Sequence, residues 1–222
     1  MKGKQGFTAV MLGLALSGMA GGLHADGEPG KFDYYVMSLS WSPDYCASSP
    51  SASNNDPQCA VGKKLGFVLH GVWPQYNRGY PSDCSDDKMP ESLVKKYQGL
   101  YPSKKLYFHE WEKHGTCSGL TPDKYLSFSQ QLKGSLAIPA NYDQPAKPFR
   151  VTADALKKDF IAANPALQAG DLSVFCSGSG RFLQELRVCY SQDGKPAECG
   201  KDVLASSRKS CGQPDFLVRS IK

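Results

Sequence analysis

Apolar and aromatic residues gather in four short runs, each with the length and composition of a β-strand. The runs cover residues 32–41, 66–73, 182–190 and 215–219. Helix signals recur between them, with Pro90 in a first turn and Thr121 and Thr152 in capping positions. They predict helices over 90–101, from 121 onward and over 152–164, and a further helix is predicted over 106–117, ending near Gly115. Polar segments 42–63 and 74–89 read as loops.

Because strands come early and late and helices lie between them, we predict an α+β fold. A central antiparallel β-sheet would carry several packed helices. Residues 26–222 have the length of a single domain of ordinary size.

The first 25 residues do not fit this pattern and are expected to be a secretory signal peptide. Lys2 and Lys4 precede an apolar, glycine-rich stretch, and Ala25 offers a small residue at a cleavage point. The apolar stretch is too short for a good membrane span, and no cysteine follows it closely, so no membrane anchor is expected. We therefore expect a periplasmic or secreted protein whose signal peptide is removed.

All eight cysteines lie after this segment, which favours four disulfides formed in an oxidising compartment. The pattern alone allows on the order of a hundred pairings. No CxxC pair is present, so a zinc knuckle is not indicated. The formal charge of +5 permits an anionic partner without demanding one.

Three histidines remain after residue 25, and all of them fall in two short motifs. His70 lies in FVLHGVWP at residues 67–74, and His109 and His114 lie in HEWEKHGTC at residues 109–117. Histidine transfers protons most readily near neutral pH. A chain that places it only here is expected to use it for chemistry.

Helical spacing divides the second motif into two pairs. Glu110 and His114 are four residues apart and share a face, and His109 and Lys113 share a neighbouring face. We expect Glu110 to orient His114 and raise its pKa, and His109 and Lys113 to hold an anionic group. The alternative is that these four side chains have no catalytic role and form an ordinary charged helix face exposed to solvent.

The competing hypothesis for this motif is a zinc-binding site. A zincin helix needs HExxH, whereas the two histidines here are one residue further apart and diverge by about 140° around the helix. We therefore expect no metal and no cofactor.

His70 comes from a predicted strand and supplies a second imidazole. Trp73 can join it on one side only if the chain leaves regular strand geometry around Gly71 or Pro74. A core position for Trp73 is equally compatible with composition. Two imidazoles across a phosphodiester are what RNA cleavage without metal requires, because one takes the 2′-hydroxyl proton and the other protonates the leaving 5′-oxygen. DNA lacks that hydroxyl and would not be cleaved.

At these residues the chain resembles the ribonuclease T2 family, which includes bacterial periplasmic ribonuclease I. The resemblance implies catalytic roles for His70, Glu110 and His114, phosphate contacts for His109 and Lys113, and base stacking for Trp73. It makes His114 the first base and His70 the first acid, although the sequence alone leaves that order open.

Many eukaryotic members carry Asp two residues after the tryptophan, and here this position is Gln75. We therefore expect low base specificity, with stacking on Trp73 and on Tyr76 or Tyr80. The resemblance also implies four disulfides, namely Cys46–Cys59, Cys84–Cys117, Cys176–Cys211 and Cys189–Cys199.

The leading hypothesis is a monomeric endoribonuclease acting on RNA. The alternatives are a non-catalytic RNA-binding relative that kept the fold and a disulfide-rich metallohydrolase.

Overall fold

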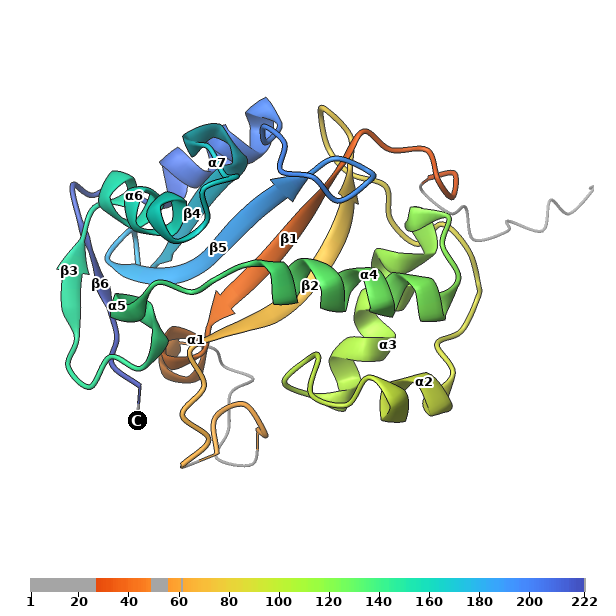
Figure 1. Cartoon of the computed structure of the whole chain (residues 1–222), viewed down its shortest axis with the longest axis horizontal. Coiled ribbons are helices and arrows are strands. Elements are labelled where there is room, and N and C mark those ends of the chain that lie inside the picture. Colours follow the sequence, from red (N-terminus) through yellow and green to blue (C-terminus); the bar gives the residue numbers. More distant parts are fainter. Residues whose placement is uncertain (1–26, 49–55, 61, 222) are drawn as a thin grey trace, which may run out of the picture.

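A computed structural model describes residues 27–48, 56–60 and 62–221, and the predicted signal peptide lies outside these ranges. The described residues form one sheet with helices packed around it (Figure 1). The strands are β1 (Tyr34–Trp41), β2 (Phe67–Gln75), β3 (Phe149–Val151), β4 (Leu172–Ser177), β5 (Phe182–Tyr190) and β6 (Phe216–Val218). The α-helices are α1 (Ser42–Ser48), α2 (Glu91–Lys96), α3 (Lys104–Lys113), α4 (Pro122–Ser135), α5 (Ala140–Asp143), α6 (Ala153–Ala163) and α7 (Lys201–Ser210), and the 3₁₀ turns are η1 (Gly115–Ser118) and η2 (Ala169–Asp171).

The sheet has the strand order β2-β1-β5-β6-β3, and β4 also pairs with β5. Its pairings are antiparallel except for one parallel bridge, between Phe182 of β5 and Leu217 of β6. The predicted α+β class with a central antiparallel sheet in a single domain is confirmed.

Strand β1 separates two apolar layers by simple alternation. Tyr35, Met37, Leu39 and Trp41 enter the larger core together with residues of α3, α4 and α6. Tyr34, Val36 and then Ser38 and Ser40 face the other way, where a smaller core includes Trp73 and Phe175. Trp73 of β2 and Glu185 and Arg187 of β5 lie on the side of this smaller core.

The predicted elements agree with the observed ones where local signals are strong. Thr121 and Thr152 cap α4 and α6, with their side chains accepting from the N–H groups of Lys124 and Ala155. The helix predicted over 90–101 is shorter, since α2 ends at Lys96 and Gly99 follows with φ +87°.

Several elements were not predicted, namely α1, α5, α7, β3, β4 and η2. Three of them, α1, β4 and α7, depend on distant partners. Helix α1 lies in the segment expected to be a loop, where its buried Asp44 pairs with Arg219. Strand β4 and helix α7 contact each other, and Ser207 of α7 hydrogen-bonds both the N–H and the carbonyl of Val174.

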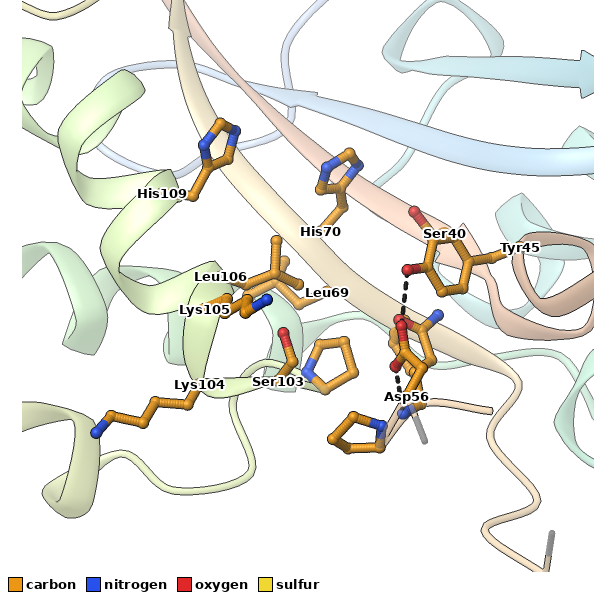
Figure 2. A pocket seen from close by; sticks show the side chains of 14 residues that line it. Ser40, Tyr45, Asp56, Leu69, His70, Ser103, Lys104, Lys105, Leu106 and His109 are labelled. Carbon is orange, nitrogen blue, oxygen red and sulfur yellow. Dashed lines mark hydrogen bonds between the residues drawn. The ribbon is translucent and has the colours of Figure 1, made fainter. Parts of the chain in front are cut away.

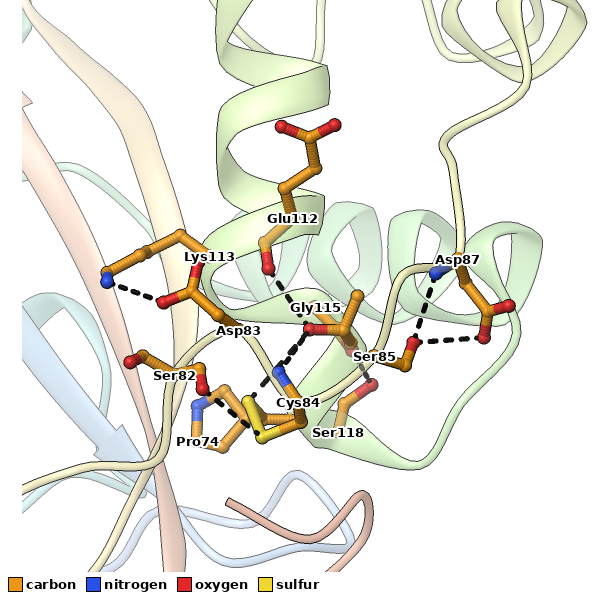
Figure 3. Close-up of a disulfide and its surroundings, with 12 residues drawn as sticks. Pro74, Ser82, Asp83, Cys84, Ser85, Asp87, Glu112, Lys113, Gly115 and Ser118 are labelled. Carbon is orange, nitrogen blue, oxygen red and sulfur yellow. Dashed lines mark hydrogen bonds and ion pairs between the residues drawn. A yellow bond between two sulfur atoms is a disulfide. The ribbon is translucent and has the colours of Figure 1, made fainter. Parts of the chain in front are cut away.

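Four disulfides link the described chain, and no described cysteine is free. Their pairs are those that the family resemblance implies, namely Cys46–Cys59, Cys84–Cys117, Cys176–Cys211 and Cys189–Cys199. The second one ties the loop after β2 to the turn after α3 (Figure 3). In the described part of the chain, no helix is long and apolar enough to cross a membrane.

Candidate active site

A bulge in β2 places His70 and Trp73 on one side of the sheet. Ser38 of β1 pairs with Gly71 and the next residue pairs with Leu69, so His70 is an extra residue on β2. Leu69 and Val72 consequently both enter the larger core. The rings of His70 and Trp73 meet edge to face with centroids 5.2 Å apart. The expected departure from strand geometry around Gly71 is confirmed.

Gly71 leaves room for the hydrogen bond that joins β2 to α3. The indole Nε1 of Trp73 donates to Oε2 of Glu110 at 2.7 Å. A Cβ on residue 71 would lie 2.0 Å from that carboxylate oxygen and 2.1 Å from the indole nitrogen. Only glycine allows the indole and the carboxylate to meet above the strand.

His70 lies between two buried carboxylates. Its Nε2 is 3.7 Å from Glu110 Oε1, and its Nδ1 is 3.9 Å from Glu185 Oε1 on β5. Burial disfavours the charged ring, and Arg187 does so too, but Glu185 and then Glu110 outweigh them and raise the pKa of His70. Burial raises the pKa of Glu110 to about 7 in spite of His70 and the indole donor.

Arg187 completes this cluster on the sheet. Its guanidinium lies 3.3 Å from Glu185 and stacks over the rings of Trp73 and Phe175 at 5.0 and 3.9 Å. Burial opposes ionisation of Glu185, but His70 and Arg187 lower its pKa. The charged carboxylate is therefore fixed beside the imidazole.

His114 also contacts Trp73, with ring centroids 5.2 Å apart and planes 34° from parallel. It is the C-cap of α3, and its N–H donates to the carbonyl of Glu110. Burial lowers the pKa of His114 to about 3, helped by the positive charges of His109, His70 and Lys113.

The expectation that Glu110 would orient His114 and raise its pKa is wrong. Helix α3 ends at Lys113, so His114 leaves the face it was predicted to share with Glu110 (φ −126°, ψ −44°). The Glu110 carboxylate turns instead to Trp73 and His70.

His109 and Lys113 extend from the same helix in different surroundings. His109 is exposed. Lys113 donates to Asp83 at 2.6 Å (Figure 3). That donation lowers the pKa of Asp83, a residue with φ +52° next to the Cys84–Cys117 disulfide. Asp83 therefore holds the ammonium group close to the turn that carries His114.

The three aromatic candidates differ in exposure. Trp73 is only 8% exposed and Tyr76 packs against the larger core. Tyr80 is 56% exposed, the one large hydrophobic side chain so exposed in the described ranges, and its ring lies 6.1 Å from His114. Tyr80 is therefore the most available stacking surface, whereas Trp73 also fulfils the core role.

A pocket of about 720 Å³ opens on the His70 side of the site, and we call it the inner pocket (Figure 2). His70 and His109 form its upper part, and Lys105 of α3 points into it. Tyr45 and Asp56 line the opposite wall, where they hydrogen-bond each other at 2.8 Å. Its volume is in the range of ligand-binding pockets.

Sequence reasoning missed Glu185, Arg187 and Asp83. Glu185 and Arg187 could have been recognised from the sequence, because they are charged residues at alternate positions of an otherwise apolar strand and so share one face. Asp83 could not have been recognised, since aspartate is common in loops. Within the described ranges, no group of three or more His, Cys, Asp or Glu side chains could hold a metal ion.

Two imidazoles lie around Trp73 and a buried carboxylate on a disulfide-linked α+β fold, an arrangement that suits acid–base chemistry. The Ribonuclease T2 family profile matches residues 32–199, and the chain belongs to this family.

Relatives with known names agree with this assignment. A ribonuclease of Aeromonas hydrophila is 38% identical over 96% of this chain and 98% of its own length. A probable ribonuclease of Haemophilus influenzae is 32% identical over 75% of this chain and 61% of its own length. A crystal structure of a ribonuclease MC1 mutant with 5′-UMP matches the fold with a TM-score of 0.64 at 20% identity, covering 83% of this chain and 97% of that one.

Proposed function

We propose that this T2-type ribonuclease cleaves single-stranded RNA by transphosphorylation through a 2′,3′-cyclic phosphate. The observation that carries the proposal is that the imidazoles of His70 and His114 both contact the indole of Trp73, with ring centroids 5.2 Å away in each case. Their pKa values are shifted in opposite directions, which supports separate acid and base roles. A base must be neutral and an acid protonated at the same pH. The lowered pKa of His114 suits the base, and the raised pKa of His70 suits the acid.

In the first step, His114 takes the proton of the 2′-hydroxyl, and the 2′-oxygen attacks phosphorus. The P–O5′ bond breaks, and His70 gives its proton to the leaving 5′-oxygen. In the second step, His70 takes a proton from water, whose oxygen attacks the cyclic phosphate. The P–O2′ bond then breaks, and His114 returns the proton to O2′.

Charge on the phosphorane is balanced by groups of α3. His109 and Lys113 lie near the imidazoles and can donate to phosphate oxygens. Asp83 keeps the ammonium of Lys113 in place. Glu110 acts through His70 and Trp73, and Glu185 positions His70 from the other ring nitrogen.

These roles orient the RNA across the site. The nucleotide that carries the 2′-hydroxyl lies on the His114 side, where the exposed ring of Tyr80 offers a stacking surface. The leaving nucleotide lies on the His70 side and enters the inner pocket. Low base specificity is supported by Gln75, which is buried and donates to the neighbouring carbonyl of Pro74.

We further propose that the protein works as a monomer in the periplasm or outside the cell after loss of residues 1–25. Four disulfides support an oxidising compartment.

Cleavage of RNA by purified protein, with and without EDTA, tests the proposal. We expect cleavage in EDTA with 2′,3′-cyclic phosphate ends. Activity abolished by EDTA would refute the mechanism in favour of a metallohydrolase. RNA binding without cleavage under either condition would favour the non-catalytic alternative.

A further inference from the structure

A second pocket adjoins the inner pocket and extends away from the catalytic residues. We call it the outer pocket; its volume is about 500 Å³. The two pockets share the short segment Pro102, Ser103 and Lys104. This shared segment at the start of α3 separates the two pockets, and we call it the ridge. A ligand that leaves the inner pocket over this ridge enters the outer one.

The outer pocket has an excess of positive charge. Lys63, Lys95 and Lys104 line it, against a single acidic residue, Glu91. Glu91 pairs with Lys104 at 2.9 Å. Lys63 and Lys95 are exposed and form no ion pair among the residues that the structure describes. Lys63 and Lys95 are thus available to bind an anion on the far side of the ridge.

Lysines 104 and 105 connect the two pockets. Lys105 points into the inner pocket, whereas Lys104 points away from it along the far side of α3, toward Glu91 (Figure 2). A series of lysines therefore lines both pockets: Lys105 the inner one, Lys104 both, and Lys95 and Lys63 the outer one. A single-stranded polyanion follows such a sequence of charges, whereas one nucleotide cannot span it.

We propose that the outer pocket is an additional RNA subsite, which binds the backbone downstream of the leaving nucleotide through Lys63 and Lys95. This inference rests on the proposed function, because the direction of the strand follows from His70 as the acid. Its lining tyrosines, Tyr101 and Tyr107, are buried, so the contacts are made to phosphate and not to bases. The subsite would favour long RNA over short RNA without adding sequence preference.

The test compares a dinucleoside phosphate, which ends in the inner pocket, with single-stranded oligouridylate, which crosses both pockets. The variant is K63S/K95S, and both side chains are exposed. The control is K158S/K209S, which removes the same charge from exposed positions of α6 and α7, across the molecule from α2 (Figure 1).

For K63S/K95S we expect kcat/KM on oligouridylate to fall about tenfold at about 50 mM salt, while dinucleotide cleavage is unchanged. The plot of log kcat/KM against log salt should flatten by about 1.4, since each lost phosphate contact on a single strand accounts for about 0.7. An equal fall in K158S/K209S would mean general charge attraction and overturn the subsite. An equal fall on the dinucleotide would overturn it too, while a wild-type protein inactive on both substrates would instead refute the proposed function.

Discussion

Gly71→Ala tests whether the contact between Trp73 and Glu110 organises the catalytic centre. The new methyl group would overlap both the carboxylate oxygen, at 2.0 Å, and the indole nitrogen, at 2.1 Å. Neither partner can yield easily, because Glu110 is 1% exposed and the indole contacts the rings of both His70 and His114. The hydrogen bond must open, and the carboxylate must move away from His70.

The size of the effect follows from this geometry. A hydrogen bond to a charged group contributes about 1.5–3 kcal/mol, and a buried carboxylate left without a donor costs a similar amount. For a domain of this size, a loss of about 1.5–3 kcal/mol lowers Tm by roughly 3–12 °C. Activity should fall further than stability, because a displacement of about 1 Å at a catalytic group can cost about 10²-fold.

The assay is kcat/KM on a dinucleoside phosphate, measured well below the Tm of each variant. Gly134→Ala is the matched control, because a Cβ there meets nothing within 4 Å and the residue lies in α4. It should keep full activity. Trp73→Phe removes the same hydrogen bond without adding a methyl group. This second variant tests the same contact if Gly71→Ala does not fold. Activity of either variant within about threefold of wild type would refute the reasoning, given the expected loss of about 10²-fold.

Four further substitutions test separate parts of the mechanism. His70→Ala and His114→Ala should each reduce kcat by about 10²–10⁴-fold, and retention of most activity in either would exclude acid–base catalysis by two imidazoles. Glu185→Gln should shift the alkaline limb of the pH–rate profile to lower pH. The reason is that His70 must be protonated to act as the acid and Glu185 raises its pKa; Glu112→Gln, on an exposed face of α3, should leave the limb in place. Lys113→Ala should lower kcat with little change in KM, and the opposite split would assign Lys113 to ground-state binding.

Local sequence signals predicted much of the fold and of the site. The alternation of β1, the run of β5 and the threonine caps of α4 and α6 are read from neighbouring residues alone. The histidine motifs likewise pointed to the elements that meet in the centre. The bulge at His70 could be expected, because two side chains of β2 needed one side of the sheet.

The remaining features depend on contacts between distant segments. Helical spacing could not reveal that α3 ends at Lys113, and so it paired Glu110 with the wrong histidine. Glu185 reaches His70 only because β5 lies beside β1 in the sheet. Helix α1 forms where Asp44 meets Arg219, which is 175 residues away. Such partners are set by topology, which no local pattern encodes.

The Cys84–Cys117 disulfide makes the assembly of the catalytic centre depend on the redox state of its surroundings. It closes a loop with a sequence separation of 33 residues that contains α2 and α3, and with them the proposed catalytic groups Glu110, Lys113 and His114. Closing a loop of that length stabilises the fold by about 4 kcal/mol in the chain-entropy view. In a reducing cytosol, Asp83 and His114 would lose this covalent link. We therefore expect newly made chains to spare the RNA of the cell that produces them and to become active after oxidation.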